Sequence, residues 1–283
     1  MKNITKMKII KYIIPLMALA LFVSCDKHEI LYNTEPVGDK AEIQIHYFEP
    51  VAAAAANYID SVYINNTLYS SVLGSGQLLT YNGVPGGSAG RFFAVKAGDV
   101  NIKFYRRDVI VYDVNVNLPS GKQNVFIHDL KKAPVVIDNG YPYRDMPTTS
   151  VTNWDTDSLV TVGFYNFLYE TAGVPYSGKI QYQYQDYRTK EWKNVGKAVA
   201  FGEFSGRELI VVVKETFNSQ GARRVDYRML DDAGEVLRVM NSSGGMVNYA
   251  DWWTATIGRH YMHIYGGFRV ATPVAAIRVW TSN

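Results

Sequence analysis

Apolar and polar residues alternate over short runs from Ala41 onward, which is the pattern of strands with one buried face. In the first half the apolar positions of these runs are Ile43 and Ile45, Val62 and Ile64, Val100, Ile102 and Phe104, then Val109, Val111, Val114 and Val116. Turn sequences such as Asn65-Asn66, Asn82-Gly83 and Pro119-Ser120-Gly121 separate the runs. Many short strands with almost no helical periodicity predict a β-sandwich over residues 41–138.

The second half shows the same all-β pattern over residues 158–283. Its apolar runs include Leu209 to Val213, then Val225, Tyr227 and Met229, then Tyr261 to Tyr265 and Ala275 to Trp280. Tyrosine and glutamine alternate from Gln181 to Gln185, so we expect one packed tyrosine face and one glutamine face in water. Residues 139–157 contain two Pro, four Thr and one Ser with few aliphatic residues, which predicts an interdomain linker.

The two halves contain similar segments, which indicate an internal duplication. Residues 121–128 read Gly-Lys-Gln-Asn-Val-Phe-Ile-His, and residues 258–265 read Gly-Arg-His-Tyr-Met-His-Ile-Tyr. An Ala-Pro-Val or Thr-Pro-Val sequence follows each, and the openings from Ile43 and from Val160 also match. We therefore expect two tandem sandwiches with equivalent first and last strands, chance matching of β-patterned sequence being the alternative.

Residues 1–24 have the layout of a secretory signal peptide, in which four lysines precede an apolar run from Tyr12 to Val23. This run is shorter than the roughly 20 residues that a membrane-spanning helix needs. It ends in Leu21-Phe22-Val23-Ser24-Cys25, which resembles the lipobox of bacterial lipoproteins. In that family the cysteine thiol receives a diacylglycerol and becomes the first residue of the mature chain. The resemblance predicts lipid attachment at Cys25 and a lipidated tether over residues 25–40, a buried free thiol being the alternative.

Removal of the signal peptide changes the charge balance. The chain of 283 residues has 29 Lys and Arg against 26 Asp and Glu, but four lysines and no acid precede Cys25, which leaves 25 against 26. A nearly neutral chain without a Lys/Arg cluster gives no support for a nucleic-acid partner, because that affinity rests on neutralising phosphates. Cys25 is the single cysteine, so the fold must form without an intrachain disulfide.

Two motifs of the first half, Asp60 to Asn66 and Val95 to Phe104, resemble those of an uncharacterised family of Ig-like β-sandwich domains that is frequent in Bacteroidetes lipoproteins. Asp60 to Asn66 matches that family's D-v-y-v-n-G motif, and Val95 to Phe104 matches its V-P-A-G motif, with Lys96 in place of the proline and Asn66 in place of the glycine. Asparagine accepts positive φ better than most residues, so the turn is preserved. The resemblance implies an Ig-like or transthyretin-like sandwich, lipid-anchored at the outer membrane on the surface or periplasmic side, and it brings no catalytic residues.

Residue patterns for metal or catalytic chemistry are weak. His260 and His263 are three apart in a predicted strand, so they point to opposite faces and cannot chelate one ion together. We expect the five histidines to lie on the surface or in pockets.

Asp155 and Asp157 beside Asn153 could offer oxygen ligands to Ca²⁺, but a solvated linker explains them better. Without a P-loop or a nucleophile motif, we predict no catalytic residue, no metal and no cofactor.

Aromatic residues form the most prominent candidate for binding. Trp252 and Trp253 are adjacent in a predicted strand, so at most one of them belongs to the core. An exposed indole beside Tyr249 and Asp251 could stack on a sugar ring and hydrogen-bond its hydroxyls, which makes these four residues the candidate binding site. The alternative is that aromatic residues simply favour strands and fill the core.

Three functional hypotheses follow from the sequence. The first is a non-enzymatic, lipid-anchored module of the cell envelope that recognises a glycan or a protein. The second is a pilus or fimbrial anchor or assembly lipoprotein, which predicts an edge strand open to a partner strand. The third is an envelope hydrolase, which predicts two carboxyl groups converging in one pocket.

Overall fold

The computed structural model describes residues 38–52, 54–71, 79–85, 92–139, 159–211 and 222–282. The predicted signal peptide, Cys25, most of the tether and all but the first residue of the predicted linker lie outside these ranges, as do Asp155 and Asp157. The boundary between the two predicted domains therefore stays a prediction. Residues Val37–Asn283 form one compact unit. Its described part contains no helix that is long and apolar enough to cross a membrane.

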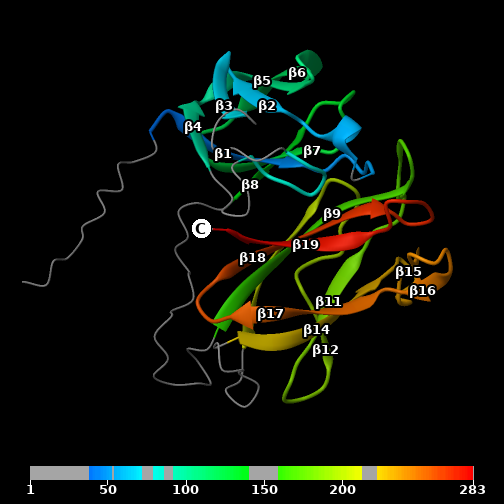
Figure 1. The fold of residues 1–283 in the computed structure, drawn as a ribbon. Coiled ribbons are helices and arrows are strands. Elements are labelled where there is room, and N and C mark those ends of the chain that lie inside the picture. The colour runs from blue at the N-terminus through cyan, green and yellow to red at the C-terminus, as the bar shows by residue number, and fades with distance from the viewer. Residues whose placement is uncertain are drawn as a thin grey trace, which may run out of the picture. The chain divides into compact units, whose positions relative to one another are not determined.

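The described residues of the first half form two four-stranded sheets (Figure 1). The elements are β1 (Lys40–Tyr47), a 3-10 helix (Ala55–Asn57), β2 (Ser61–Ile64), β3 (Thr67–Ser71), β4 (Phe93–Lys96), β5 (Gly98–Arg106), β6 (Val109–Leu118), β7 (Gly121–Ile127) and β8 (Val135–Asp138). One sheet has the order β4-β1-β7-β8 and the other β3-β2-β5-β6. Alternate residues of both sheets, such as Ile43, Val62 and Ile102, meet in one apolar core.

The second half also places its core between two layers of strands. The elements are β9 (Leu159–Thr171), β10 (Val174–Pro175), β11 (Gln181–Gln185), β12 (Trp192–Asn194), β13 (Phe204–Val211), β14 (Ala222–Leu230), β15 (Arg238–Met240), β16 (Met246–Asn248), β17 (Ala250–Thr256), β18 (His260–Phe268) and β19 (Ala276–Ser282). One sheet has the order β10-β9-β18-β19, and β13 also pairs with β9, on the edge opposite β18. The second sheet has the order β12-β11-β14-β17. The all-β prediction is confirmed.

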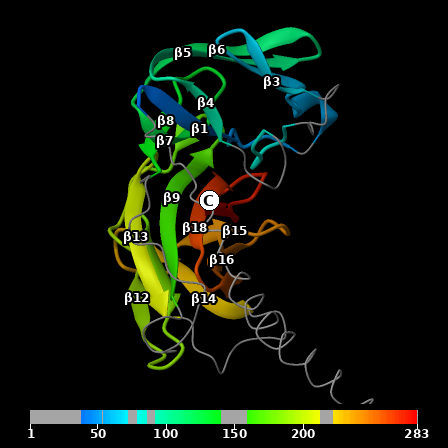
Figure 2. The same ribbon diagram turned by 90° about the vertical axis from the view of Figure 1, so that its left-hand side faces the viewer.

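Both halves contain the same arrangement of three paired strands. β1 pairs with β7 in parallel, and β9 pairs with β18 in parallel (Figure 2). The following strand then returns antiparallel, as β8 on β7 and as β19 on β18. The first strands and the closing strands that the repeat predicts to be equivalent therefore occupy equivalent positions.

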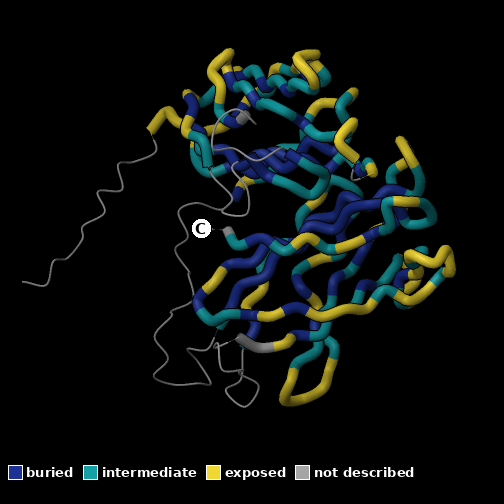
Figure 3. The backbone as a smooth tube through the Cα atoms, viewed as in Figure 1, coloured by how far each residue is buried: buried dark blue, intermediate teal, exposed yellow. Residues whose placement is uncertain are grey.

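The parallel strand pairs are buried on both faces, and they are dark blue in Figure 3. In β1 the side chains of Ile43, Ile45 and Tyr47 enter the core of the first half, and the next residue, Phe48, belongs to a separate apolar cluster. This second cluster combines residues of both halves: Phe48, Val84, Phe126, Tyr165, Phe167, Met262, Ile264 and Trp280. Phe126 stacks near Phe167, with 4.6 Å between ring centroids. We call this group the shared aromatic cluster.

The Asn65-Asn66 turn has the geometry that its sequence predicts. Both residues have positive φ, 49° and 62°, as in the two-residue turns that best join twisted antiparallel strands. Asn65 also accepts a hydrogen bond from the backbone N–H of Asn101 at 2.9 Å. Asn66 therefore serves where the resembling family has glycine.

Candidate functional site

The outer face of the β12-β11-β14-β17 sheet carries the candidate binding residues. In β11, Tyr182 and Tyr184 are buried in the core, whereas Gln181, Gln183 and Gln185 lie on the other face. The predicted division into a packed tyrosine face and a wet glutamine face is confirmed. Strand pairing extends the glutamine side across the sheet, because residues directly opposite each other point to the same side.

The strand register fixes the members of this surface. Gln183 lies opposite both Asn194 and Arg228, Gln185 lies opposite Trp192, and Asp226 lies opposite Trp252. We call the resulting surface the polar-aromatic face; it comprises Gln181, Gln183, Gln185, Trp192, Asn194, Arg224, Asp226, Arg228, Trp252 and Thr254. Trp192 on β12 and Trp252 on β17 are three strand spacings apart, which is about 14 Å.

Each tryptophan of the polar-aromatic face is paired with an arginine. The Arg224 guanidinium lies 5.0 Å from the centre of the Trp252 ring, and the Arg228 guanidinium lies 4.4 Å from that of Trp192. Cation–π contacts of this kind hold both planar groups in a defined orientation. The surface therefore presents two oriented aromatic positions, separated on the intervening strands by the amide of Gln185 and the carboxylate of Asp226.

The four residues predicted from the sequence as a binding site lie in different environments in the structure. Trp252 is 50% exposed and lies on the polar-aromatic face. Trp253 is 5% exposed and packs against Tyr261 and His263, which removes it from the candidate binding residues. The prediction that at most one of the two tryptophans belongs to the core is confirmed.

Tyr249 and Asp251 lie beside this strand in different environments. The Tyr249 hydroxyl accepts a hydrogen bond from the Ile277 backbone N–H at 3.1 Å, and its ring contacts Tyr265. Burial raises the pKa of Tyr249 to about 12. Asp251 is exposed and accepts the backbone N–H of Trp252 at 2.8 Å. Tyr249 therefore supports the core, and Asp251 lies within β17, where its carboxylate binds the backbone next to Trp252.

Sequence reasoning missed Trp192 and both arginines. Trp192 lies between charged residues, outside any apolar run, so no local pattern singles it out. Its relation to Arg228 arises from the pairing of β12 with β11 and of β11 with β14. The available signal was the glutamine alternation in β11, which identified the wet face to which these residues belong.

The histidines are more buried than the sequence suggested. His46, His128, His260 and His263 are all at most 6% exposed, so the expected surface positions are wrong, although His128 does line a pocket. His263 packs in the core of the second half, 2.9 Å from the Tyr182 hydroxyl. Its neighbours Met262 and Ile264, which share a face of β18 with His260, belong to the shared aromatic cluster. The prediction that His260 and His263 point to opposite faces is confirmed.

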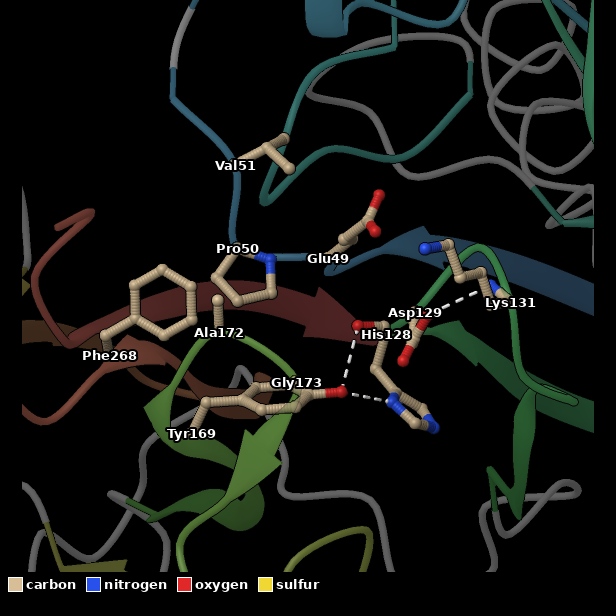
Figure 4. A pocket seen from close by; sticks show the side chains of 10 residues that line it. All are labelled: Glu49, Pro50, Val51, His128, Asp129, Lys131, Tyr169, Ala172, Gly173 and Phe268. Carbon is tan, nitrogen blue, oxygen red and sulfur yellow. Dashed lines mark hydrogen bonds between the residues drawn. The ribbon is translucent and has the colours of Figure 1, made fainter. Parts of the chain in front are cut away.

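A pocket of about 290 Å³ forms a second candidate site (Figure 4). Its polar groups come from Glu49, His128, Asp129, Lys131 and Tyr169, and Phe268 contributes an aromatic wall. The Tyr169 hydroxyl donates to the His128 carbonyl oxygen at 3.1 Å and lies 2.7 Å from Nδ1 of the same residue. The pocket thus gathers residues that are far apart in the sequence.

The two carboxyl groups of this pocket have different electrostatic environments. Burial raises the pKa of Glu49, whose carboxylate accepts a hydrogen bond from the Tyr47 hydroxyl at 3.2 Å. Partial burial opposes ionisation of Asp129, but hydrogen bonds from the Lys131 backbone and from Lys132 outweigh it and hold the pKa below its usual range. Two carboxyl groups in one pocket are what the hydrolase hypothesis requires. No cluster of three acidic, His or Cys side chains among the described residues could hold a metal ion.

The architecture is that of an all-β chain with one exposed sheet face rich in aromatic and amide groups. No family model matches the sequence, and no curated protein matches it significantly.

Several solved structures show remote similarity to the chain. A candidate cell adhesion protein from Bacteroides uniformis is 11% identical over 88% of this chain and 99% of its own, with a TM-score of 0.24. Another from Bacteroides ovatus is 10% identical over 86% of this chain and 95% of its own, with a TM-score of 0.18. A leucine-rich repeat protein from Bacteroides thetaiotaomicron is 11% identical over 82% of this chain and 26% of its own, with a TM-score of 0.20, so the chain spans about a quarter of that protein. TM-scores of this size do not establish a shared arrangement of strands.

Proposed function

We propose that this protein is a non-enzymatic, lipid-anchored component of the bacterial cell envelope that binds a glycan through its polar-aromatic face. The observation that carries the proposal is the presence of two tryptophans, each stacked with an arginine, on one exposed sheet face. Lipid anchoring rests on the lipobox-like sequence ending at Cys25, and placement at the outer membrane rests on the resemblance to Bacteroidetes lipoproteins.

The chemistry of the face suits an extended oligosaccharide. Sugar rings have apolar C–H faces that pack on indole rings, and their hydroxyls pair with amides and guanidinium groups. Gln185 lies opposite Trp192 and offers such an amide on the way to Trp252, and Gln183 and Asn194, joined by a 2.8 Å hydrogen bond, flank this row on the side of Trp192. A separation of about 14 Å between strand positions accommodates a ligand of several sugar units, each aromatic ring contacting a different one.

Trp252→Ala should weaken glycan binding about tenfold or more and leave the fold intact, because the side chain is 50% exposed and central aromatic anchors dominate recognition energies. Binding would be measured on a glycan array and then by titration calorimetry. Leu209→Ala is the matched control, since Leu209 is 48% exposed on β13 of the other sheet and should leave affinity unchanged. Equal affinities for wild type and Trp252→Ala would reject this face as the binding site.

Cys25→Ser should abolish incorporation of labelled palmitate and release the protein from the membrane fraction, because the thiol is the acceptor of the lipid in the lipoproteins that the sequence resembles. Ser24→Ala keeps a small residue before the cysteine and should retain the label. Palmitate labelling that survives in Cys25→Ser would show that the lipid is attached elsewhere.

The assembly hypothesis is favoured by a separate observation on β6. This strand pairs with β5 alone among the described strands, and Val109 and Ile110 at its start are 62% and 46% exposed. An open edge of this kind can accept a strand from a partner. If assembly is the function, Val109→Lys should dissolve complexes seen by size-exclusion chromatography, whereas a wild-type protein that stays monomeric with envelope extracts counts against it.

A further inference from the structure

The two arginines of the polar-aromatic face differ in their charge environment. Nε and one terminal nitrogen of Arg224 donate to Asp226 Oδ1 at 3.0 and 2.7 Å, so its positive charge is balanced. Arg228 donates through Nε to Gln183 Oε1 at 2.8 Å and stacks on Trp192, both of which are neutral. Within the described part of the chain, Arg228 has no carboxylate partner.

The Arg228 guanidinium is held in a fixed orientation. Gln183 is itself positioned by its amide nitrogen, which donates to Asn194 Oδ1 at 2.8 Å, so its oxygen faces Arg228. The Trp192 ring lies along one side of the guanidinium at 4.4 Å. These contacts engage Nε and one face of the guanidinium, so its two terminal nitrogens remain available to a ligand. Two parallel N–H groups of guanidinium match the two oxygens of a carboxylate.

We propose that the polar-aromatic face selects glycans that carry carboxylate groups, with Arg228 as the residue that reads the carboxylate. This inference rests on the proposed function and adds the ligand class to it, namely uronic-acid-containing oligosaccharides. One sugar places its carboxylate on the terminal nitrogens of Arg228 beside Trp192. A neutral sugar packs at Trp252, where Asp226 already balances Arg224.

Substitution of the two arginines should have different effects on the preference for an acidic ligand. Loss of Arg228 should remove the preference for the acidic ligand, whereas loss of Arg224 should leave that preference in place. Asp226→Asn should raise affinity for the acidic ligand, because it frees Arg224 from its carboxylate. A hydrogen bond between charged groups corresponds to a preference of about tenfold or more in affinity.

The experiment is titration calorimetry of the full mature chain against matched charged and uncharged polymers: oligogalacturonate with its methyl ester, and glucuronoxylan with xylan. Methyl esterification removes the charge and keeps the sugar chain. Wild type should bind the acidic member of a pair about tenfold more tightly, and Arg228→Gln should bind both members equally. Arg228→Lys should recover only part of the preference, because a point charge does not form the paired hydrogen bonds.

Controls separate this inference from the proposed function. Circular dichroism and urea unfolding should show Arg228→Gln to be folded like wild type. Equal binding of both members of each pair by wild type, with Trp252→Ala still weaker, overturns the carboxylate preference and keeps glycan binding. If wild type binds no member of these pairs and no glycan on the array, both proposals fail.

Discussion

Acidification from pH 7 to pH 4 should destabilise the folded protein by several kcal/mol. Burial lowers the pKa of His46 and of His263 from 6.5 to about 3, because neither imidazole can be hydrated when charged. Each pKa is lower in the folded than in the unfolded state, so the unfolded chain takes up these protons first. The stability is fully present above pH 6.5 and is lost progressively as the pH falls towards 3, about 3 kcal/mol for each histidine at pH 4.

The surroundings of the two imidazoles explain the size of this effect. His46 is stacked on Phe126 at 4.6 Å between ring centroids, and its Nε2 lies 3.4 Å from Asn124 Oδ1. His263 is enclosed by Tyr182 and Trp253. No carboxylate touches either ring among these contacts, so a proton would leave an uncompensated buried charge. Burial lowers the pKa values of His128 and His260 as well, which adds loss of stability in the same direction.

Two measurements test the acid sensitivity. Urea unfolding midpoints should fall steadily between pH 7 and pH 4, and the slope should be smaller in His263→Gln, whose side chain is not charged in either state. Proton NMR should show the His46 and His263 rings untitrated from pH 8 to pH 5 in the native protein, whereas every histidine of the urea-unfolded chain titrates near 6.5. A native His263 ring that titrates near pH 6.5 would contradict the prediction.

Trp253→Ala should destabilise the protein by about 3–5 kcal/mol, because it leaves a cavity in the core of the second half. The ring has lost nearly all solvent contact and lies 4.6 and 4.7 Å from the rings of Tyr261 and His263. Urea unfolding monitored by far-ultraviolet circular dichroism gives the free energy directly.

The neighbouring residue provides the control for this experiment. Trp252→Ala removes the same side chain one position earlier on the same strand, and it should change the free energy of unfolding by about 0.5 kcal/mol or less. The pair should therefore separate stability from binding: Trp253→Ala costs stability, and Trp252→Ala costs affinity. Equal free energies of unfolding for the two variants would show that the two side chains are not divided between core and surface.

The sequence allowed the strands to be predicted wherever one face is wet. Gln181 to Gln185 is the clearest case, because period-two alternation reports burial on a single face. Alternation did not predict the burial of β1, because Gln44 and His46 are fully buried although their polarity suggests an outward, exposed position. Its outward side is covered through the shared aromatic cluster, whose residues come from both halves of the chain, and local alternation carries no information about such long-range packing.

The candidate sites could likewise be predicted only where the sequence pattern is local. Trp252 was accessible to sequence reasoning because it stands next to a second tryptophan in a predicted strand, so one of the two rings had to face outward. Its partner Arg224 and the pair of Trp192 with Arg228 come together only through the register of neighbouring strands. Glu49 and Asp129 share a pocket for the same non-local reason.

The parallel pairing of β1 with β7 determines how the protein would carry mechanical load. With the proposed lipid anchor at the N-terminus and the proposed glycan site on the second half, β1 would be pulled towards its first residue and the chain beyond β7 in the opposite direction. Seven residue pairs, from Ala41 with Gly121 to Tyr47 with Ile127, then share this force in shear. The hydrogen bonds of this strand pair would be loaded together and not one at a time, which is the loading that the proposed lipid anchor and glycan site would produce.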